Sequence, residues 1–394
     1  MTTAGTATPT PIFDNLTLLK STPITSDDIK YAVEFLGAYA GSNATFNAYR
    51  REVERLLHWC GEISHKSLRD ITRADFEDFL RFCQNPPKSW IGLKNVTRFT
   101  DKDNTRVPNP DWRPFVVSIS KKSFHDGIRP SVDDYLLSQN ALQAIFAIIS
   151  SFYQFLIQEG YAEVNPVAQI RQKSQFLRKT QGSKVIRKLS DVQWRYVIKA
   201  AENMDDRTLF IMNALYSMYL RISELSSSIR WEPQMQHFFK DGDGNWWFKT
   251  VGKGNKERDI AVSDAMLEAL KRYRTGLNLS PLPSPGEAIP LIAKNKGKGA
   301  VTGTRHIRKL VQACFDKAAD ELIRDNFHDE GDQLRSATVH WLRHTGISED
   351  VKVRPREHVR DDAGHGSGAI TDRYINVELR ERHASAKGKL IKVD

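Results

Sequence analysis

The chain has few cysteines and lacks a long hydrophobic run. Its 394 residues include three cysteines, Cys60, Cys83 and Cys314, which lie far apart and form no CxxC pair. This argues against a disulfide framework and a cysteine zinc site, and it indicates a reducing cytoplasm. No run of about 18 apolar residues is present, and the Thr/Pro/Ala-rich start contains no signal-like apolar segment. We therefore expect a cytoplasmic chain with no membrane partner.

The net charge indicates the kind of partner, and the chain length indicates the number of domains. The formal net charge is +10 at neutral pH. Such an excess indicates an acidic partner, either nucleic acid or an anionic membrane, and DNA is the more common reason for it. The length exceeds that of one ordinary core, so we expect two domains with tails.

Hydrophobic periodicity predicts a helical first half. Amphipathic patterns cover 27–36 and 45–60, and a third helix is expected to begin after an N-cap at Thr72. The longest apolar stripe predicts a core helix from Ser138 to Glu159, ended by Gly160 and Pro166.

Three segments of the first half lack this pattern. Residues 1–24 offer little to pack and are expected to form a flexible arm before a helical domain over 25–170. Residues 85–130 are expected to be an irregular insertion, whose basic and aromatic residues would either grip DNA or fold back onto the core. Residues 171–188 are basic and acid-free, which indicates a linker lying along something negatively charged.

The second half is expected to be mostly helical with a small sheet. Residues 246–262 alternate around the turn Gly252-Lys253-Gly254-Asn255, which predicts a β-hairpin. A second domain is expected over 189–380, followed by a C-terminal tail over 381–394. The predicted helices cover 190–203, 206–225, 304–322 and 336–350.

Two arginines in this half suit a phosphate ligand. Arg221 lies in LRISEL, and Arg343 follows His340 by three residues in HWLRHT, on the same helix face. The planar fork of an arginine can donate two parallel hydrogen bonds to a phosphate. Taken singly, each segment is typical of a solvated helix.

A lysine, a histidine and a tyrosine extend this set. Lys253 lies between two glycines in GKGNKER, at the predicted hairpin tip; the turn is not a P-loop, because GxxxxGK[ST] is absent. Tyr374 follows His365 by nine residues in AGHGSGAITDRYINV. A tyrosine with a pKa of about 10 is a poor nucleophile unless cations and a base activate it, and the segments above supply candidates for both.

In this order and spacing, the five segments resemble the tyrosine recombinase/phage integrase family, in its Xer-like branch. The match covers about residues 188–380, and SQNALQAIFAIISSFYQFLIQEGYAEVNP resembles the last helices of the family's core-binding domain. The resemblance implies a mainly α fold with a small β-sheet, in which an all-helical core-binding domain precedes an α+β catalytic domain. It also implies a site-specific recombinase or integrase, of the kind carried by mobile genetic elements.

The resemblance further implies the roles in phosphate binding and attack. Tyr374 would attack DNA and form a 3′-phosphotyrosyl link. Arg221 and Arg343 would clamp the scissile phosphate, and Glu224 would orient Arg221.

The remaining roles concern protons and the phosphate oxygens. Lys253 would protonate the leaving 5′ oxygen, His340 would accept or shuttle the tyrosine proton, and His365 would hydrogen-bond the phosphate. No cofactor, ATP or metal is implied, because bond energy is kept in the protein–DNA link and positive side chains stabilise the developing charge.

The implied partners are a double-stranded DNA recombination site and further copies of the chain in a synaptic tetramer. Accessory DNA-bending or partner recombinase proteins are further candidates. The tail would dock on a neighbouring protomer through Leu390 and Ile391, or else remain a frayed basic terminus.

The chain also departs from the family pattern. Tyr219 stands where the family usually has glycine, and the segment 325–333 is longer than a minimal member needs. The insertion at 85–130 matches nothing in the smallest members.

Three alternatives stay open at this point. His340 and His344 have the i, i+4 spacing of zinc ligands and His365 could be a third, although the glutamate of HExxH is missing. A non-catalytic DNA-binding protein would fit the charge, but it gives no reason for the ordered set. A type IB topoisomerase or telomere-resolving enzyme would share the chemistry.

Overall fold

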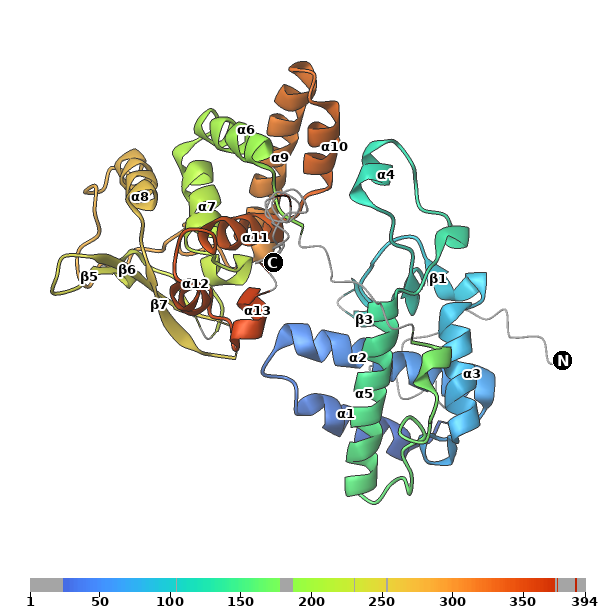
Figure 1. Cartoon of the computed structure of the whole chain (residues 1–394). Coiled ribbons are helices and arrows are strands. Elements are labelled where there is room, and N and C mark those ends of the chain that lie inside the picture. Colours follow the sequence, from blue (N-terminus) through green and yellow to red (C-terminus); the bar gives the residue numbers. More distant parts are fainter. Residues whose placement is uncertain are drawn as a thin grey trace, which may run out of the picture. The chain divides into compact units, whose positions relative to one another are not determined.

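The computed structural model describes residues 24–103, 105–177, 187–229, 231–252, 254–372, 374 and 387. Residues 1–23 of the predicted arm lie outside these ranges, whereas its last residue, Ile24, is buried in the core of the first unit. The middle of the predicted linker, Lys253 and nearly all of the predicted tail, including its two anchor residues, also lie outside them. The chain divides into two compact units, Met1–Gly182 and Ser183–Asp394, and each has its own hydrophobic core (Figure 1).

Long helices form the core of the first unit. Local caps begin them where the sequence predicts: Thr72 forms a capping box with Asp75, and Ser138 accepts a hydrogen bond from the Ala141 amide. The helices are α1 (Ser26–Gly37), α2 (Asn43–Trp59), α3 (Arg73–Gln84) and α5 (Gln139–Gln158), and α2 continues into a π-helical turn over Cys60–Ser64.

Helix α5 is the central helix of this unit. By length and composition alone it could cross a membrane, although the polar residues Gln143, Ser150 and Ser151 interrupt its apolar sequence. Its apolar face is used inside the protein, because residues such as Ile145, Ile149, Phe152 and Leu156 are buried in the core cluster of the first unit.

The segment 85–130 is more ordered than predicted. It contains a parallel pair, β1 (Ile91–Gly92) with β4 (Phe115–Val116), an antiparallel pair, β2 (Phe99–Lys102) with β3 (Thr105–Pro108), and the short helix α4 (Lys121–His125). Strands this short leave no periodicity to read in a sequence. Trp90 and Phe115 join the core cluster of the first unit, as one of the two alternatives predicts. Phe99 and Trp112 are also buried, whereas Phe124 is exposed.

The second unit combines a three-stranded antiparallel sheet, which lies at one edge of the unit, with helices (Figure 1). The strands β5 (Phe238–Lys240), β6 (Trp246–Val251) and β7 (Glu257–Ala261) pair in that order. The helices are α6 (Asp191–Glu202), α7 (Asp206–Ser217), α8 (Asp264–Gly276), α9 (Thr304–Arg324), α10 (His328–Ser336), α11 (Val339–Asp350), α12 (Arg356–Ala363) and α13 (Gly368–Asp372). The fold is mainly helical with small sheets, which confirms the predicted class. The first unit is not all-helical as expected, because it contains the two strand pairs β1–β4 and β2–β3.

Two helices begin or end at other residues than the sequence predicted. The helix expected over 206–225 stops at Ser217, and the chain bends at Tyr219, whose φ is +49°, before a 3₁₀ turn over Ile222–Leu225. The helix expected from Ser336 begins at Val339, because Ser336 closes α10, a helix that packs on α9 and accounts for the extra length near 325–333. Apolar residues continue through the bend, so no sequence signal marked it.

Candidate active site

One cavity of about 900 Å³ in the second unit brings the predicted residues together. The side chains that line it include five of the six predicted site residues: Arg221, His340, Arg343, His365 and Tyr374. The sixth, Lys253, lies outside the described residues, but Gly252 and Gly254 on either side of it line the same cavity. Segments far apart in the sequence therefore meet at a single site.

The backbone approaches that build this site depend on glycines. Gly346 of α11 lies against the carbonyl of Tyr216 at the end of α7, and a Cβ added to Gly346 would overlap that carbonyl. Gly364 ends α12 with a φ of +62° and lies beside the Arg258 side chain. Glycine at these positions lets α11 approach the end of α7, shortly before Arg221, and lets the end of α12 approach Arg258 of β7.

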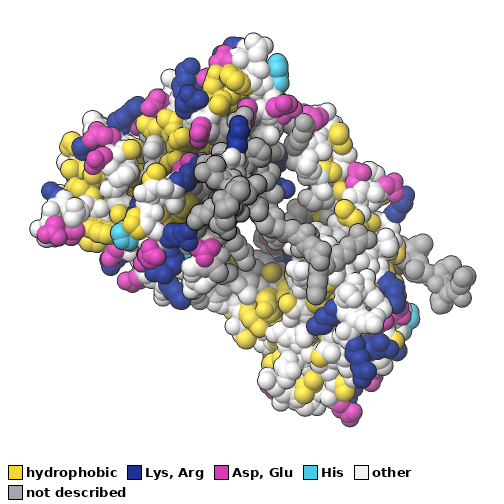
Figure 2. Space-filling view, viewed as in Figure 1, with side chains coloured by type: hydrophobic (Ala, Val, Ile, Leu, Met, Phe, Trp, Pro, Cys, Tyr) yellow, Lys and Arg dark blue, Asp and Glu magenta, His cyan; other side chains and the backbone are white. Residues whose placement is uncertain are grey.

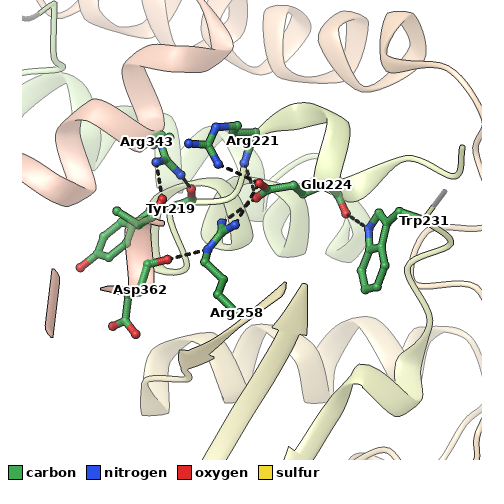
Figure 3. A network of polar contacts seen from close by, with 8 residues as sticks. Tyr219, Arg221, Glu224, Trp231, Arg258, Arg343 and Asp362 are labelled. Carbon is green, nitrogen blue, oxygen red and sulfur yellow. Dashed lines mark hydrogen bonds and ion pairs between the residues drawn. The ribbon is translucent and has the colours of Figure 1, made fainter. Parts of the chain in front are cut away.

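A buried carboxylate holds Arg221 in position (Figure 3). Glu224, with a side chain 2% exposed, accepts hydrogen bonds from the Arg221 amide at 2.9 Å and from Arg221 Nη1 at 3.0 Å. Arg258 adds two more, from Nη1 at 3.1 Å and Nη2 at 2.8 Å, and its Nε donates to the carbonyl of Asp362 at 2.9 Å. Burial raises the pKa of Glu224, but the bonds and charges of Arg258 and Arg221 outweigh it, so the pKa lies below its usual value and the group is ionised.

Arg343 is the most enclosed of the described cations that line the cavity. It is 5% exposed and donates from Nη1 to the carbonyl of Tyr219 and from Nη2 to the carbonyl of Ala363 at 2.6 Å (Figure 3). Burial and the nearby charge of Arg221 lower its pKa to about 10, so it remains protonated at neutral pH. Both acceptors are neutral, and its positive charge is therefore still available to an anion in the cavity.

Tyr219 adopts a positive φ at the position where the family pattern usually has glycine. Its positive φ favours glycine, and a tyrosine there is strained. The side chain offsets this strain: it is fully buried, and its hydroxyl donates to Asp350 and accepts from Arg354 Nη1 at 2.9 Å. The bend that presents the Tyr219 carbonyl to Arg343 is thus held by side-chain contacts.

Two histidine rings flank Tyr374. His344 Nδ1 and Tyr374 Oη share a hydrogen bond of 2.7 Å, and the His365 ring stacks on the tyrosine with centroids 5.7 Å apart at 16°. His365 Nδ1 is hydrogen-bonded to Thr371 Oγ1 at 2.9 Å. Burial raises the pKa of Tyr374, while the charges of Arg343 and Arg221 partly oppose that change. The hydroxyl is consequently protonated at neutral pH.

The histidines of the cavity are neutral at pH 7. Burial, together with His340 and Arg343, lowers the pKa of His344 to about 4, and burial with the nearby arginines lowers that of His365 to about 4. Burial followed by Arg343, Arg308 and Arg221 also lowers the pKa of His340. A neutral imidazole can accept a proton, which an imidazolium cannot.

Sequence reasoning missed two members of this site. Arg258 ends GKGNKER and was not singled out, and His344 was considered only as a zinc ligand. The usable signal for His344 was its place directly after Arg343 and four residues after His340, on the same face of α11. Within the described ranges, no group of three or more His, Cys, Asp or Glu residues is arranged to hold a metal ion.

The chain is similar in sequence to named bacterial proteins. No family model matches the chain. The chain is 24% identical over 324 residues to the tyrosine recombinase XerC of Bacillus licheniformis, covering 79% of this chain and 87% of that protein. It is 26% identical over 254 residues to the tyrosine recombinase XerD of Staphylococcus saprophyticus, covering 61% and 72%.

Solved structures share the fold. A lambda integrase dimer bound to a COC′ core site aligns with a TM-score of 0.51 at 14% identity, covering 93% of this chain and 79% of that one. XerH site-specific recombinase bound to a palindromic difH substrate aligns with a TM-score of 0.52 at 15% identity, covering 95% and 92%. These similarities support assignment of the chain to the tyrosine recombinase family. As the sequence predicted, it is an enzyme of the tyrosine-type site-specific recombinase class.

Proposed function

We propose that this recombinase cuts and rejoins DNA strands at specific sites through a 3′-phosphotyrosyl intermediate formed by Tyr374. The observation that carries the proposal is the lining of one cavity, where Arg221, Arg343 and the Tyr374 hydroxyl lie among neutral histidines. Two fixed arginines can bind the non-bridging oxygens of a phosphodiester, and their charge stabilises the pentacovalent transition state.

The proposed step conserves one phosphoester bond. Tyr374 Oη attacks the scissile phosphorus, the bond from phosphorus to the 5′ oxygen breaks, and the leaving oxygen takes a proton from Lys253. The tyrosine proton passes to a neutral histidine of α11, which the family resemblance assigns to His340. Rejoining is the reverse reaction with a new 5′ hydroxyl, so neither ATP nor a cofactor takes part.

His365 completes the phosphate site in this proposal. Its Nδ1 is hydrogen-bonded to Thr371 Oγ1, and the proposal assigns the Thr371 hydroxyl as the donor, which leaves the proton of the neutral ring on Nε2. That Nε2–H is then the donor to a phosphate oxygen. Stacking on Tyr374 holds the two rings in register, so the nucleophile and the phosphate are oriented together.

The proposed substrate is double-stranded DNA, and the proposed assembly is a synaptic tetramer on it. Lys and Arg side chains are exposed on both units (Figure 2), and the net charge of +10 suits a polyanion. Docking of the tail on a neighbouring protomer, help from accessory proteins and a cytoplasmic location belong to the same proposal.

Incubation with a nicked suicide duplex tests the function directly. The chain is expected to form an adduct that survives denaturing electrophoresis, and Tyr374→Phe is expected to form none while still binding the duplex. An adduct of undiminished yield with Tyr374→Phe overturns the proposal.

A further inference from the structure

We propose that His344 is a catalytic residue of this recombinase, whose Nδ1 takes the proton from Tyr374 Oη as that oxygen attacks phosphorus. The inference rests on the proposed function of Tyr374 and specifies which histidine serves it. It differs from the role that the family resemblance gives to His340.

The first support is contact with the reacting atom. His344 Nδ1 lies 2.7 Å from Tyr374 Oη, which is the range expected for a base and the proton that it abstracts. Among the described residues, the histidine rings that contact Tyr374 are those of His344 and His365. His340 lies one turn earlier on α11, and its ring centroid is 6.3 Å from that of His344.

The second support is that His365 is oriented for another task. Its ring is stacked on Tyr374 at 16°, so it presents its face to the tyrosine ring, and its Nδ1 is engaged by Thr371. His344 is tilted by 40° and directs a nitrogen at the hydroxyl. The two histidines therefore contact different parts of Tyr374: His365 stacks on its ring, and His344 is hydrogen-bonded to its hydroxyl oxygen.

The third support is the charge around the pair. His340 and Arg343 lie on the same helix as His344, while Tyr374 and His365 face it from the C-terminal segment. Burial, with a smaller contribution from His340 and Arg343, lowers the pKa of His344 and keeps the imidazole neutral before DNA binds. A phosphate bound by Arg343 and Arg221 brings negative charge that offsets theirs, which makes His344 more basic at the moment of attack.

The proton and the electrons balance in this step. The Oη–P bond forms as the Oη–H bond breaks, and the proton moves to Nδ1 while the P–O5′ bond breaks and the 5′ oxygen takes a proton from Lys253. In the rejoining step His344 returns its proton to the departing tyrosine oxygen. A single histidine next to the nucleophile thus serves both directions.

A substrate with a different leaving group distinguishes a residue that takes the proton from Tyr374 from one that gives a proton to the leaving 5′ oxygen. In a duplex with a 5′-bridging phosphorothioate, the leaving thiolate needs no proton, so the adduct yield of Lys253→Ala is expected to recover. His344→Ala is expected to form adduct about a hundredfold or more slowly on the oxygen substrate, and to remain slow on the sulfur substrate. Recovery of His344→Ala on the sulfur substrate would move its action to the leaving group and overturn the inference.

His344→Asn distinguishes a base from a mere support. The asparagine amide can keep a hydrogen bond to Tyr374 near the Nδ1 position, but it cannot take the proton. We expect it to be as slow as His344→Ala, with duplex binding and the thermal unfolding midpoint close to those of the parent chain. If His344→Asn or His344→Ala cleaves at or above the rate of the parent chain, proton transfer to His344 is contradicted. The assignment of Tyr374 as the nucleophile would then remain intact. Adduct formation by Tyr374→Phe would instead remove the proposed function itself.

Discussion

Arg258 and Glu224 form a two-pronged ion pair inside the second unit, with Nη1–Oε1 at 3.1 Å and Nη2–Oε2 at 2.8 Å. Glu224 also binds Arg221. Arg221, which the sequence motifs predicted, and Arg258, which they did not, therefore share one carboxylate. Both partners of the Arg258 pair are almost fully buried, at 9% and 2% exposed side chain. Removing one partner leaves the other charge poorly compensated.

Arg258→Ala is therefore expected to lower the free energy of unfolding by about 3–5 kcal/mol. Adduct formation should fall too, because Glu224, which positions Arg221, loses the arginine that holds it. The control is Arg272→Ala, which breaks an exposed pair with Asp206 and should cost less than about 1 kcal/mol. Chemical denaturation of the two variants gives the comparison, and equal losses would contradict the importance of the buried pair.

Arg343→Lys tests whether charge alone suffices. Lysine keeps a cation but cannot span the Tyr219 and Ala363 carbonyls and a phosphate with one planar fork. We expect adduct formation to fall by on the order of a hundredfold, with duplex binding largely retained. Arg272→Lys, on the exposed surface, serves as the matched control. Parental rates for Arg343→Lys would show that the fork is dispensable.

Stability is expected to fall on acidification. The pKa of His344 and of His365 is about 4 in the folded unit, against about 6.5 for an unfolded histidine. Between these values the unfolded chain binds protons that the folded unit excludes, so the free energy of unfolding decreases as the pH drops from about 7 to about 4. Thermal unfolding midpoints across this range should decline less for His344→Gln/His365→Gln than for the parent chain. Parallel declines would refute the assignment to these two rings.

Adduct formation should persist in EDTA. The proposed steps stabilise charge with Arg221 and Arg343 and move protons through side chains. Single-turnover cleavage with and without the chelator checks this. A cleavage step that stops in EDTA and resumes on adding zinc or magnesium would favour the metal-dependent alternative.

Local signals made much of the fold predictable. The caps at Thr72, Ser138 and Ser190 act on amides three residues away, so they can be read without tertiary structure. The bend at Tyr219 could not be read this way. Its positive φ is held by Asp350 and Arg354, which are close to it only once α11 has packed.

The site divides in the same manner. Ordered motifs marked the five residues that now share a cavity, whereas the contacts of Arg258 and His344 depend on how β7, α11 and the C-terminal segment meet. Spacing places His344 on the same helix face as His340, but only the fold decides which of them reaches Tyr374. The role of Lys253 stays a prediction.

The most direct test of the account is to identify the residue that carries DNA. The adduct formed on a suicide duplex can be digested with protease and nuclease, and the peptide bearing a nucleotide remnant sequenced by mass spectrometry. The account predicts a 3′-phosphate esterified to Tyr374 and a free 5′ hydroxyl on the released strand. A nucleotide on any other residue, or a 5′-phosphate linkage to the protein, would contradict it.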